Sequence, residues 1–110
     1  MSELAVHDAI VPEIWAYEIA DIIFISFRKR GRITHEQIAE YLKRLRALPI
    51  RVERSDLWAN VALESRACEW DIAAYDASYL DLALRKGLPL ATADDRLREA
   101  AVAAGIALLG

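Results

Sequence analysis

The front of the chain carries a long apolar stretch that ends at a glycine. Residues 12–30 are apolar at most positions, and Pro12 suits the first turn of a helix, where its missing N–H group costs nothing. Gly31 is a natural helix C-cap, so the pattern predicts a helix over residues 12–30. Because this helix is apolar nearly all round, we expect it to be largely buried. No strand is predicted before it, since Leu4–Val6 is too short.

A second helix is predicted from residue 34. The sequence Thr-His-Glu-Gln at 34–37 forms a capping box, with the hydroxyl residue first and the amide three residues later. An apolar stripe follows at Ile38, Tyr41, Leu42 and Leu45. Residues 50–53 then alternate apolar and charged side chains, which predicts a short strand.

The second half of the chain alternates helices with short apolar segments. Ser55 is expected to cap a helix that runs to about Cys68. A further helix is predicted over residues 74–86 and is closed by Gly87, followed by a short buried strand at 88–92.

The last elements complete this rhythm. Asp94 or Asp95 begins a helix that ends at Gly105, and residues 106–109 are a final strand. Helix, strand, helix and strand in this order are typical of a parallel sheet flanked by helices. We therefore predict a single α/β domain over residues 1–110.

Composition narrows the class of protein without naming it. The chain has 110 residues, 55% apolar and 28% charged, which is typical of one globular domain. Its 14 basic and 17 acidic residues give a net charge of −3, which argues against a general nucleic-acid coat. A nuclease is compatible with this balance, because carboxylates that bind a divalent metal lower the formal charge. Two basic clusters either meet phosphate or complement helix ends: Arg28, Lys29, Arg30 and Arg32, and Lys43, Arg44 and Arg46.

Location and redox state follow from what the sequence carries. A single cysteine, Cys68, allows no internal disulfide. Residues 14–27 are too short and too charged to span a bilayer, since Glu18 and Asp21 interrupt them. No signal-peptide pattern is present at the start, so we expect a cytoplasmic protein.

Acidic residues are the main candidates for chemistry. Glu18 and Asp21 are three residues apart and share one side of the predicted first helix. A buried carboxylate has to be neutral, ion-paired or bound to metal. The alternative is that one of the two faces solvent while the other pairs with an arginine.

Three further acids stand at predicted helix starts. Asp76 lies in a first turn, and Asp94 and Asp95 follow a predicted strand, where a parallel sheet forms its ligand crevice. Taken singly, each is explained by the helix dipole or by capping. Taken together, they suit Mg²⁺ or Mn²⁺, which prefer oxygen ligands. The sequence has no cysteine–histidine spacing for zinc and no glycine-rich phosphate loop.

Two adjoining motifs resemble a known family. Residues 75–83, YDASYLDLA, resemble the YDAxYLxLA signature of VapC-type PIN domains, and GLPLATAD at 87–94 matches GxPLxTxD. Upstream, VPEIW at 11–15 with Glu18 resembles vPxlWxxEvaN. The resemblance implies a three-layer fold with a parallel sheet and the activity of an Mg²⁺- or Mn²⁺-dependent toxin endoribonuclease. It also implies an RNA substrate and a VapB-like antitoxin as partners.

The resemblance also implies roles for individual residues. Glu18, Asp76 and Asp94 match three acidic site residues that are catalytic and bind metal. Thr92 matches the hydroxyl residue before the last acid. Asp95 is an additional acid beside this metal set, and Asp21 stands where the family commonly has asparagine.

The start of the chain departs from the family pattern. The family begins with a strand that carries an Asp and a following helix, and the eleven residues before Pro12 contain no such motif. The expected fold is therefore one that lacks its first strand and helix. A start codon set too late, a degenerate toxin and a homodimer that fills the gap all remain open, and the apolar front helix favours self-association. The alternatives to a ribonuclease are an inactive PIN-like module that binds an antitoxin or RNA, and a helical domain whose acids only cap helices.

Overall fold

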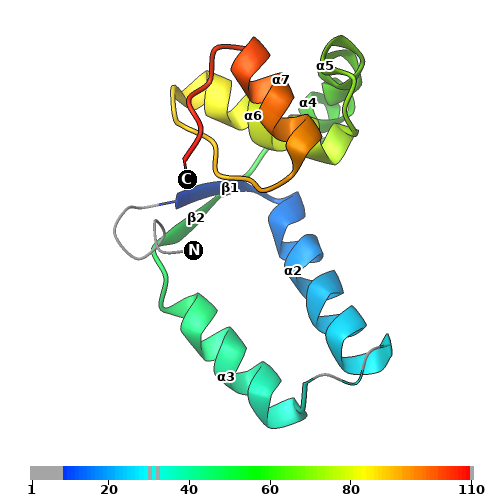
Figure 1. Cartoon of the computed structure of the whole chain (residues 1–110), viewed down its shortest axis with the longest axis vertical. Coiled ribbons are helices and arrows are strands. Elements are labelled where there is room, and N and C mark those ends of the chain that lie inside the picture. Colours follow the sequence, from blue (N-terminus) through cyan, green and yellow to red (C-terminus); the bar gives the residue numbers. More distant parts are fainter. Residues whose placement is uncertain (1–8, 30, 32, 110) are drawn as a thin grey trace. The chain divides into compact units, whose positions relative to one another are not determined.

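The structure is a computed structural model that describes residues 9–29, 31 and 33–109. These residues form helices together with strands that pair in parallel, which confirms the predicted α/β class (Figure 1). The chain divides into two compact units, residues 1–53 and 54–110, and each is described here by itself. The single domain over residues 1–110 remains a prediction.

The first unit holds a two-stranded parallel sheet whose strands are joined through helices. In chain order its elements are β1 (Ala9–Pro12), α2 (Ile14–Phe24), the π-helical turn η1 (Ile25–Lys29), α3 (His35–Arg46) and β2 (Ile50–Glu53). Strand β1 pairs with β2 in a register that sets Ala9 opposite Ile50 and Pro12 opposite Glu53. The predicted strand at 50–53 is confirmed with the same bounds.

Strand β1 overturns the prediction that no strand precedes the first helix. Pro12 is the last residue of this strand, and the helix begins two residues later at Ile14. A proline is tolerated there because a strand end can dispense with its N–H group. The partner of β1 is about forty residues away in the sequence, so no local pattern marks the strand. Leu4–Val6 lies outside the described residues.

Helix α2 is far more exposed than its composition predicts. None of its residues is buried, and Tyr17, Ile22 and Phe24 are 74%, 54% and 50% exposed. The prediction of a largely buried helix is therefore wrong for the structure described. A helix that is apolar on all sides needs neighbours on all sides to be buried. The described part of the chain does not supply enough of them.

The capping box before α3 is confirmed. The Gln37 N–H donates to the Thr34 hydroxyl oxygen at 3.2 Å, and the Thr34 N–H donates to Gln37 Oε1 at 2.8 Å. Two N–H groups that the helix itself leaves without a partner are thereby satisfied. The start of α3 is thus fixed by four consecutive residues, which is why the sequence predicts it well.

Over residues 54–109, the second unit is built from four helices and one parallel bridge. Its helices are α4 (Leu57–Val61), α5 (Leu63–Trp70), α6 (Ala74–Lys86) and α7 (Asp95–Ala103). The predicted strands at 88–92 and 106–109 are reduced to a single bridge between Leu90 and Leu108. Leu90 N–H donates to Ala107 O, and Leu109 N–H donates to Leu90 O, both at 2.9 Å. The parallel direction that the sequence predicts is kept.

The helix ends of this unit test the predicted caps. Helix α6 has the predicted bounds, and Gly87 closes it with a left-handed φ of 64°. The predicted cap at Ser55 is wrong, because Asp56 is the N-cap and accepts a hydrogen bond from Ala59 N–H at 2.8 Å. The predicted helix from there to Cys68 is divided at Ala62 into α4 and α5.

The buried core of the second unit lies between α6, α7 and the bridge. Leu80 and Ala101 are fully buried, and Leu97 from the first turn of α7 is 4% exposed. The buried cluster consists of Leu80, Ala83, Leu90, Leu97, Ala100 and Ala101. This packing fixes α6 and α7 against each other, and Asp76, Thr92, Asp94 and Asp95 lie on these two helices or in the segment between them.

Candidate functional site

The two acids of the first unit lie on α2. Glu18 is half-buried, whereas Asp21 is exposed. The alternative in which one of these acids faces solvent therefore describes Asp21. Since Glu18 belongs to a different unit from Asp76 and Asp94, the convergence of these three acids remains a prediction.

Asp76 lies in the first turn of α6 and is half-buried. The residue at the helix N-cap, Ala73, has no side chain that could cap the helix. A carboxylate in this turn interacts favourably with the positive end of the helix dipole. The helix dipole is thus by itself a sufficient structural reason for an acid at this position.

Asp94 is the N-cap of α7, as one of the two sequence interpretations predicts. Its Oδ1 accepts a hydrogen bond from Leu97 N–H at 2.8 Å. Its own N–H donates to the hydroxyl oxygen of Thr92 at 3.2 Å. Asp95 follows as the first residue of α7 and is exposed. Thr92 and Asp94, to which the family resemblance assigns neighbouring site roles, are therefore in direct contact.

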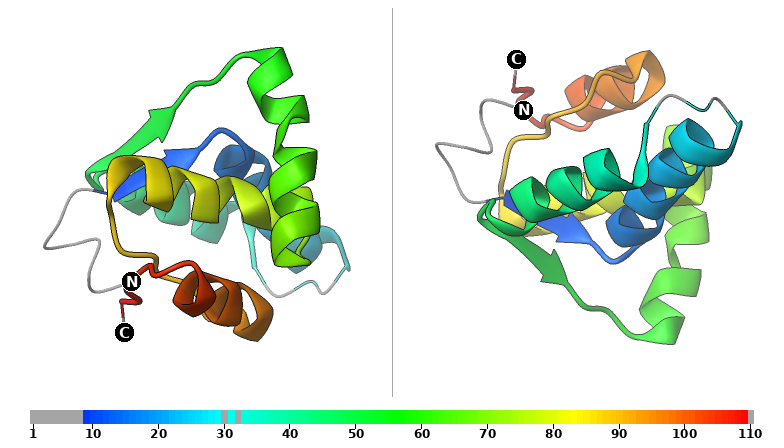
Figure 2. Two further views of the ribbon diagram at one scale, coloured as in Figure 1. Left: turned by 90° about the horizontal axis from the view of Figure 1, so that it is seen from above. Right: turned by 90° about the horizontal axis from the view of Figure 1, so that it is seen from below.

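Helices α6 and α7 begin at the same end of the second unit. Figures 1 and 2 show that the segment after α6 returns along the unit before α7 starts, so that both helices run away from a common end. Asp76 at the start of α6 and the Asp94–Asp95 pair at the start of α7 therefore belong to one end of this unit. Sequence position alone, 18 residues apart, gives no hint of this.

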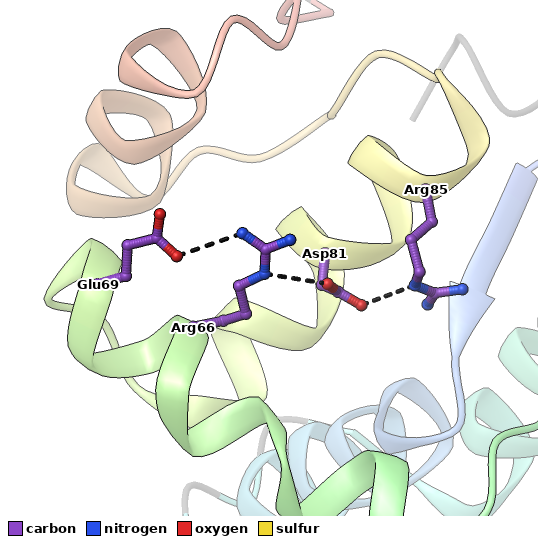
Figure 3. Close-up of polar contacts among 4 residues, drawn as sticks. All are labelled: Arg66, Glu69, Asp81 and Arg85. Atoms are coloured by element: carbon purple, nitrogen blue, oxygen red, sulfur yellow. Dashed lines mark hydrogen bonds and ion pairs between the residues drawn. The ribbon is translucent and has the colours of Figure 1, made fainter.

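An ion-pair network ties α6 to α5. Asp81 accepts a hydrogen bond from Arg85 Nε at 2.7 Å, and its other oxygen lies 3.6 Å from Arg66 Nε. Arg66 also pairs with Glu69 at 3.2 Å (Figure 3). Its guanidinium lies over the ring of Trp70. The Asp81 side chain is only 17% exposed, so its two arginine partners matter more than those of a fully solvated acid. The network restrains α6, and α6 in turn carries Asp76 in its first turn.

Arg98, Asp81 and Arg85 take part in these contacts and were not predicted from the sequence. Arg98 donates from Nη1 to the carbonyl oxygen of Thr92 at 3.0 Å. Asp81 and Arg85 have the four-residue spacing of a helical ion pair, which the sequence does display. The contact between Arg98 and Thr92 depends on the turn between them and has no comparable signal.

The basic clusters fall at helix ends in the first unit. Arg28 and Lys29 lie in the last turn of η1, and α3 ends with Lys43, Arg44 and Arg46. Arg44 is paired with Glu40 at 3.2 Å. This arrangement agrees with the helix-dipole interpretation and leaves the exposed cations available to phosphate. Arg30 and Arg32 lie outside the described residues.

The described residues contain neither a ready-made metal cluster nor a membrane-spanning helix. Among residues 9–29, 31 and 33–109, no three or more His, Cys, Asp or Glu side chains gather closely enough to hold a metal ion. In the same part of the chain, no helix has the length and apolar character needed to cross a membrane.

The likeness of this chain to known proteins lies at the level of the family. Neither the curated proteins nor the solved structures contain a protein that matches this chain. The family described as PIN domain matches over residues 2–103, which is nearly the whole chain. This range includes α6, α7 and the segment between them, where Asp76, Thr92 and Asp94 lie. The chain therefore belongs to the PIN domain family, a family of nuclease-type domains.

Proposed function

We propose that this PIN domain is a metal-dependent endoribonuclease of the VapC toxin type. The observation that carries the proposal is the common end of α6 and α7, which bears Asp76, Asp94 and Asp95 together with Thr92. Nuclease-type function follows from the family, and RNA as the substrate follows from the resemblance of residues 75–94 to VapC toxins. Glu18 on α2 is proposed as the third acid of the site.

The residue types of the proposed site suit a hard divalent cation, although among the described residues no three of them gather closely enough to hold one. Asp76, Asp94 and Glu18 offer carboxylate oxygens, which Mg²⁺ and Mn²⁺ prefer, and Asp95 adds a further one. PIN domains generally depend on divalent metal. When bound, such an ion supplies a polarised water and offsets the negative charge of the phosphate.

The residues of the chain have separable tasks at this site. Oδ1 of the Asp94 carboxylate accepts a hydrogen bond from Leu97 N–H, and the carboxylate retains further lone pairs for a ligand. Capping therefore holds the carboxylate in place without consuming it. The Thr92 hydroxyl accepts a hydrogen bond from Asp94 N–H and still has its own proton to donate, so it can orient a neighbouring oxygen.

Substitution of the acids tests the proposal directly. Asp76→Asn and Asp94→Asn keep size and polarity but remove the charge, and we expect each to reduce Mn²⁺-dependent RNA cleavage at least about 100-fold, since loss of a mere supporting group costs 10–100-fold. Glu64→Gln is the control, because Glu64 is an exposed acid in the first turn of α5. Cleavage is measured on a labelled RNA pool with Mg²⁺, Mn²⁺ or a chelator. Cleavage that survives chelation and both Asn substitutions would refute the metal mechanism.

The exposed apolar side chains of α2 favour a second candidate, an inactive PIN-like module that binds a VapB-like antitoxin or RNA. Tyr17, Ile22 and Phe24 offer contact area for a partner. This candidate expects tight association with a partner and no turnover of any RNA. Metal-dependent cleavage by the pure protein would rule it out.

The same side chains lead us to propose a homodimer. Ile22→Glu places a charge among them and should shift the protein from dimer to monomer in light scattering at equal concentration. Val102→Glu is the control, because Val102 is a similarly exposed aliphatic residue on α7. A wild-type protein that is monomeric at all concentrations would contradict the proposed dimer.

A further inference from the structure

Arg98 differs from the neighbouring arginine on the same helix. Its side chain is half-buried and donates from Nη1 to the carbonyl oxygen of Thr92 at 3.0 Å. The Arg96 side chain is 71% exposed and binds the carbonyl and carboxylate of Asp71 at 3.1 and 3.2 Å. Two arginines that lie two residues apart on one helix, and therefore on different sides of it, thus bind different segments of the second unit.

Arg98 donates hydrogen bonds to both ends of the three-residue segment Thr92–Asp94. Its backbone N–H makes the ordinary helical hydrogen bond to the carbonyl oxygen of Asp94 at 2.9 Å, while its guanidinium adds a side-chain bond to the carbonyl oxygen of Thr92. Between these two hydrogen bonds, Asp94 N–H donates to the Thr92 hydroxyl oxygen. Apart from the cap that Asp94 Oδ1 provides to Leu97 N–H, little packing holds this segment, because Ala93 and Asp94 are exposed. A hydrogen bond from a charged donor is stronger than one between neutral groups.

We propose that Arg98 is a positioning residue that holds Thr92 and Asp94 in the geometry the site requires. Its guanidinium acts through the Thr92 carbonyl and not by touching the RNA or the metal. A carboxylate that shares in metal binding needs a fixed direction, and the groups behind it set that direction. The catalytic consequence of this inference rests on the proposed function, whereas the restraint on the segment does not.

Amide hydrogen exchange without metal tests the restraint. In Arg98→Met, which keeps the aliphatic stem, we expect the amides of Asp94 and Leu97 to exchange about tenfold faster, because a charge-assisted hydrogen bond is lost. Arg98→Lys retains a cation but lacks the planar fork and should lie between Met and wild type. Arg96→Met is the matched control and should leave both amides unchanged. Equal effects of Arg98→Met and Arg96→Met, or equal acceleration throughout α6 and α7, would overturn the inference.

Two further measurements keep the test decisive. If Arg98→Met does not fold, the carbonyl carbon shift of Thr92 in Arg98→Lys replaces it, and an unchanged shift overturns the inference. With RNA and Mn²⁺, Arg98→Met should lower kcat about tenfold and leave KM within twofold, with partial recovery in Arg98→Lys. A rise in KM with kcat unchanged would make Arg98 an RNA contact and overturn the positioning role. If wild type cleaves no RNA, the proposed function fails, while the exchange experiment still decides the role of Arg98.

Discussion

Asp94 illustrates how one side chain can serve the fold and the proposed site together. Its Oδ1 caps α7 through Leu97 N–H, and capping alone is a sufficient reason for an acid at this position. The structural role and the proposed metal role nevertheless differ in what they demand. A cap needs one hydrogen-bond acceptor, whereas a divalent cation needs a negative charge. Substitutions that keep the acceptor and remove the charge separate the two.

Asp94→Asn and Asp94→Ala make this separation measurable. Asparagine caps helices as well as aspartate, so we expect Asp94→Asn to change the free energy of unfolding by less than about 0.5 kcal/mol. Alanine removes the cap and should cost about 1 kcal/mol. Urea unfolding followed by circular dichroism measures both. If asparagine destabilises the protein as much as alanine does, the charge itself carries the structural role and the separation fails.

Element boundaries show which parts of the fold a sequence can predict. The capping box at Thr34–Gln37 and the glycine after α6 are complete within a few residues, so α3 and α6 were predicted with the observed starts or ends. Strand β1 and the common end of α6 and α7 depend on partners far away in the chain, and no local pattern marks them. The exposure of α2 could not be predicted for a related reason. Apolar composition shows that a helix favours burial, but it does not show whether the rest of the chain covers that helix.

The closure of α6 by Gly87 gives a prediction at the scale of the element. Gly87 has a φ of 64°, and a Cβ placed on it would meet nothing within 4 Å. The cost of Gly87→Ala is therefore conformational and should be about 1 kcal/mol of unfolding free energy, with no contribution from a clash. Gly87→Asn should cost less, because asparagine adopts the left-handed region more readily. Thermal unfolding of the wild type and the two variants measures these costs. A Gly87→Ala protein as stable as Gly87→Asn, or more stable, would contradict the prediction.

At the scale of the whole molecule, the question is whether residues 1–110 fold as one domain. The buried core that we describe belongs to the second unit, with Leu80 fully buried among side chains of α6, α7 and the bridge. In the first unit, no described residue is buried. A two-stranded sheet with partly exposed helices has marginal stability when it stands alone. The sheet of β1 and β2 should therefore draw its stability from cooperation with the rest of the chain.

Leu80→Ala tests this cooperation. Removing a fully buried leucine side chain should lower the free energy of unfolding by about 2–5 kcal/mol. If the chain is one domain, the backbone resonances of β1 and of α6 should disappear at the same urea concentration in wild type, and both midpoints should fall together in the variant. Leu57→Ala, at a position 66% exposed in α4, is the control and should leave both midpoints nearly unchanged. If β1 kept its wild-type urea midpoint in the variant while the midpoint of α6 fell, the two units would fold independently. Glu18 would then reach the acids of the second unit only through a mobile connection, and a site built from all three would be far less well ordered than hydrolysis of a phosphodiester requires.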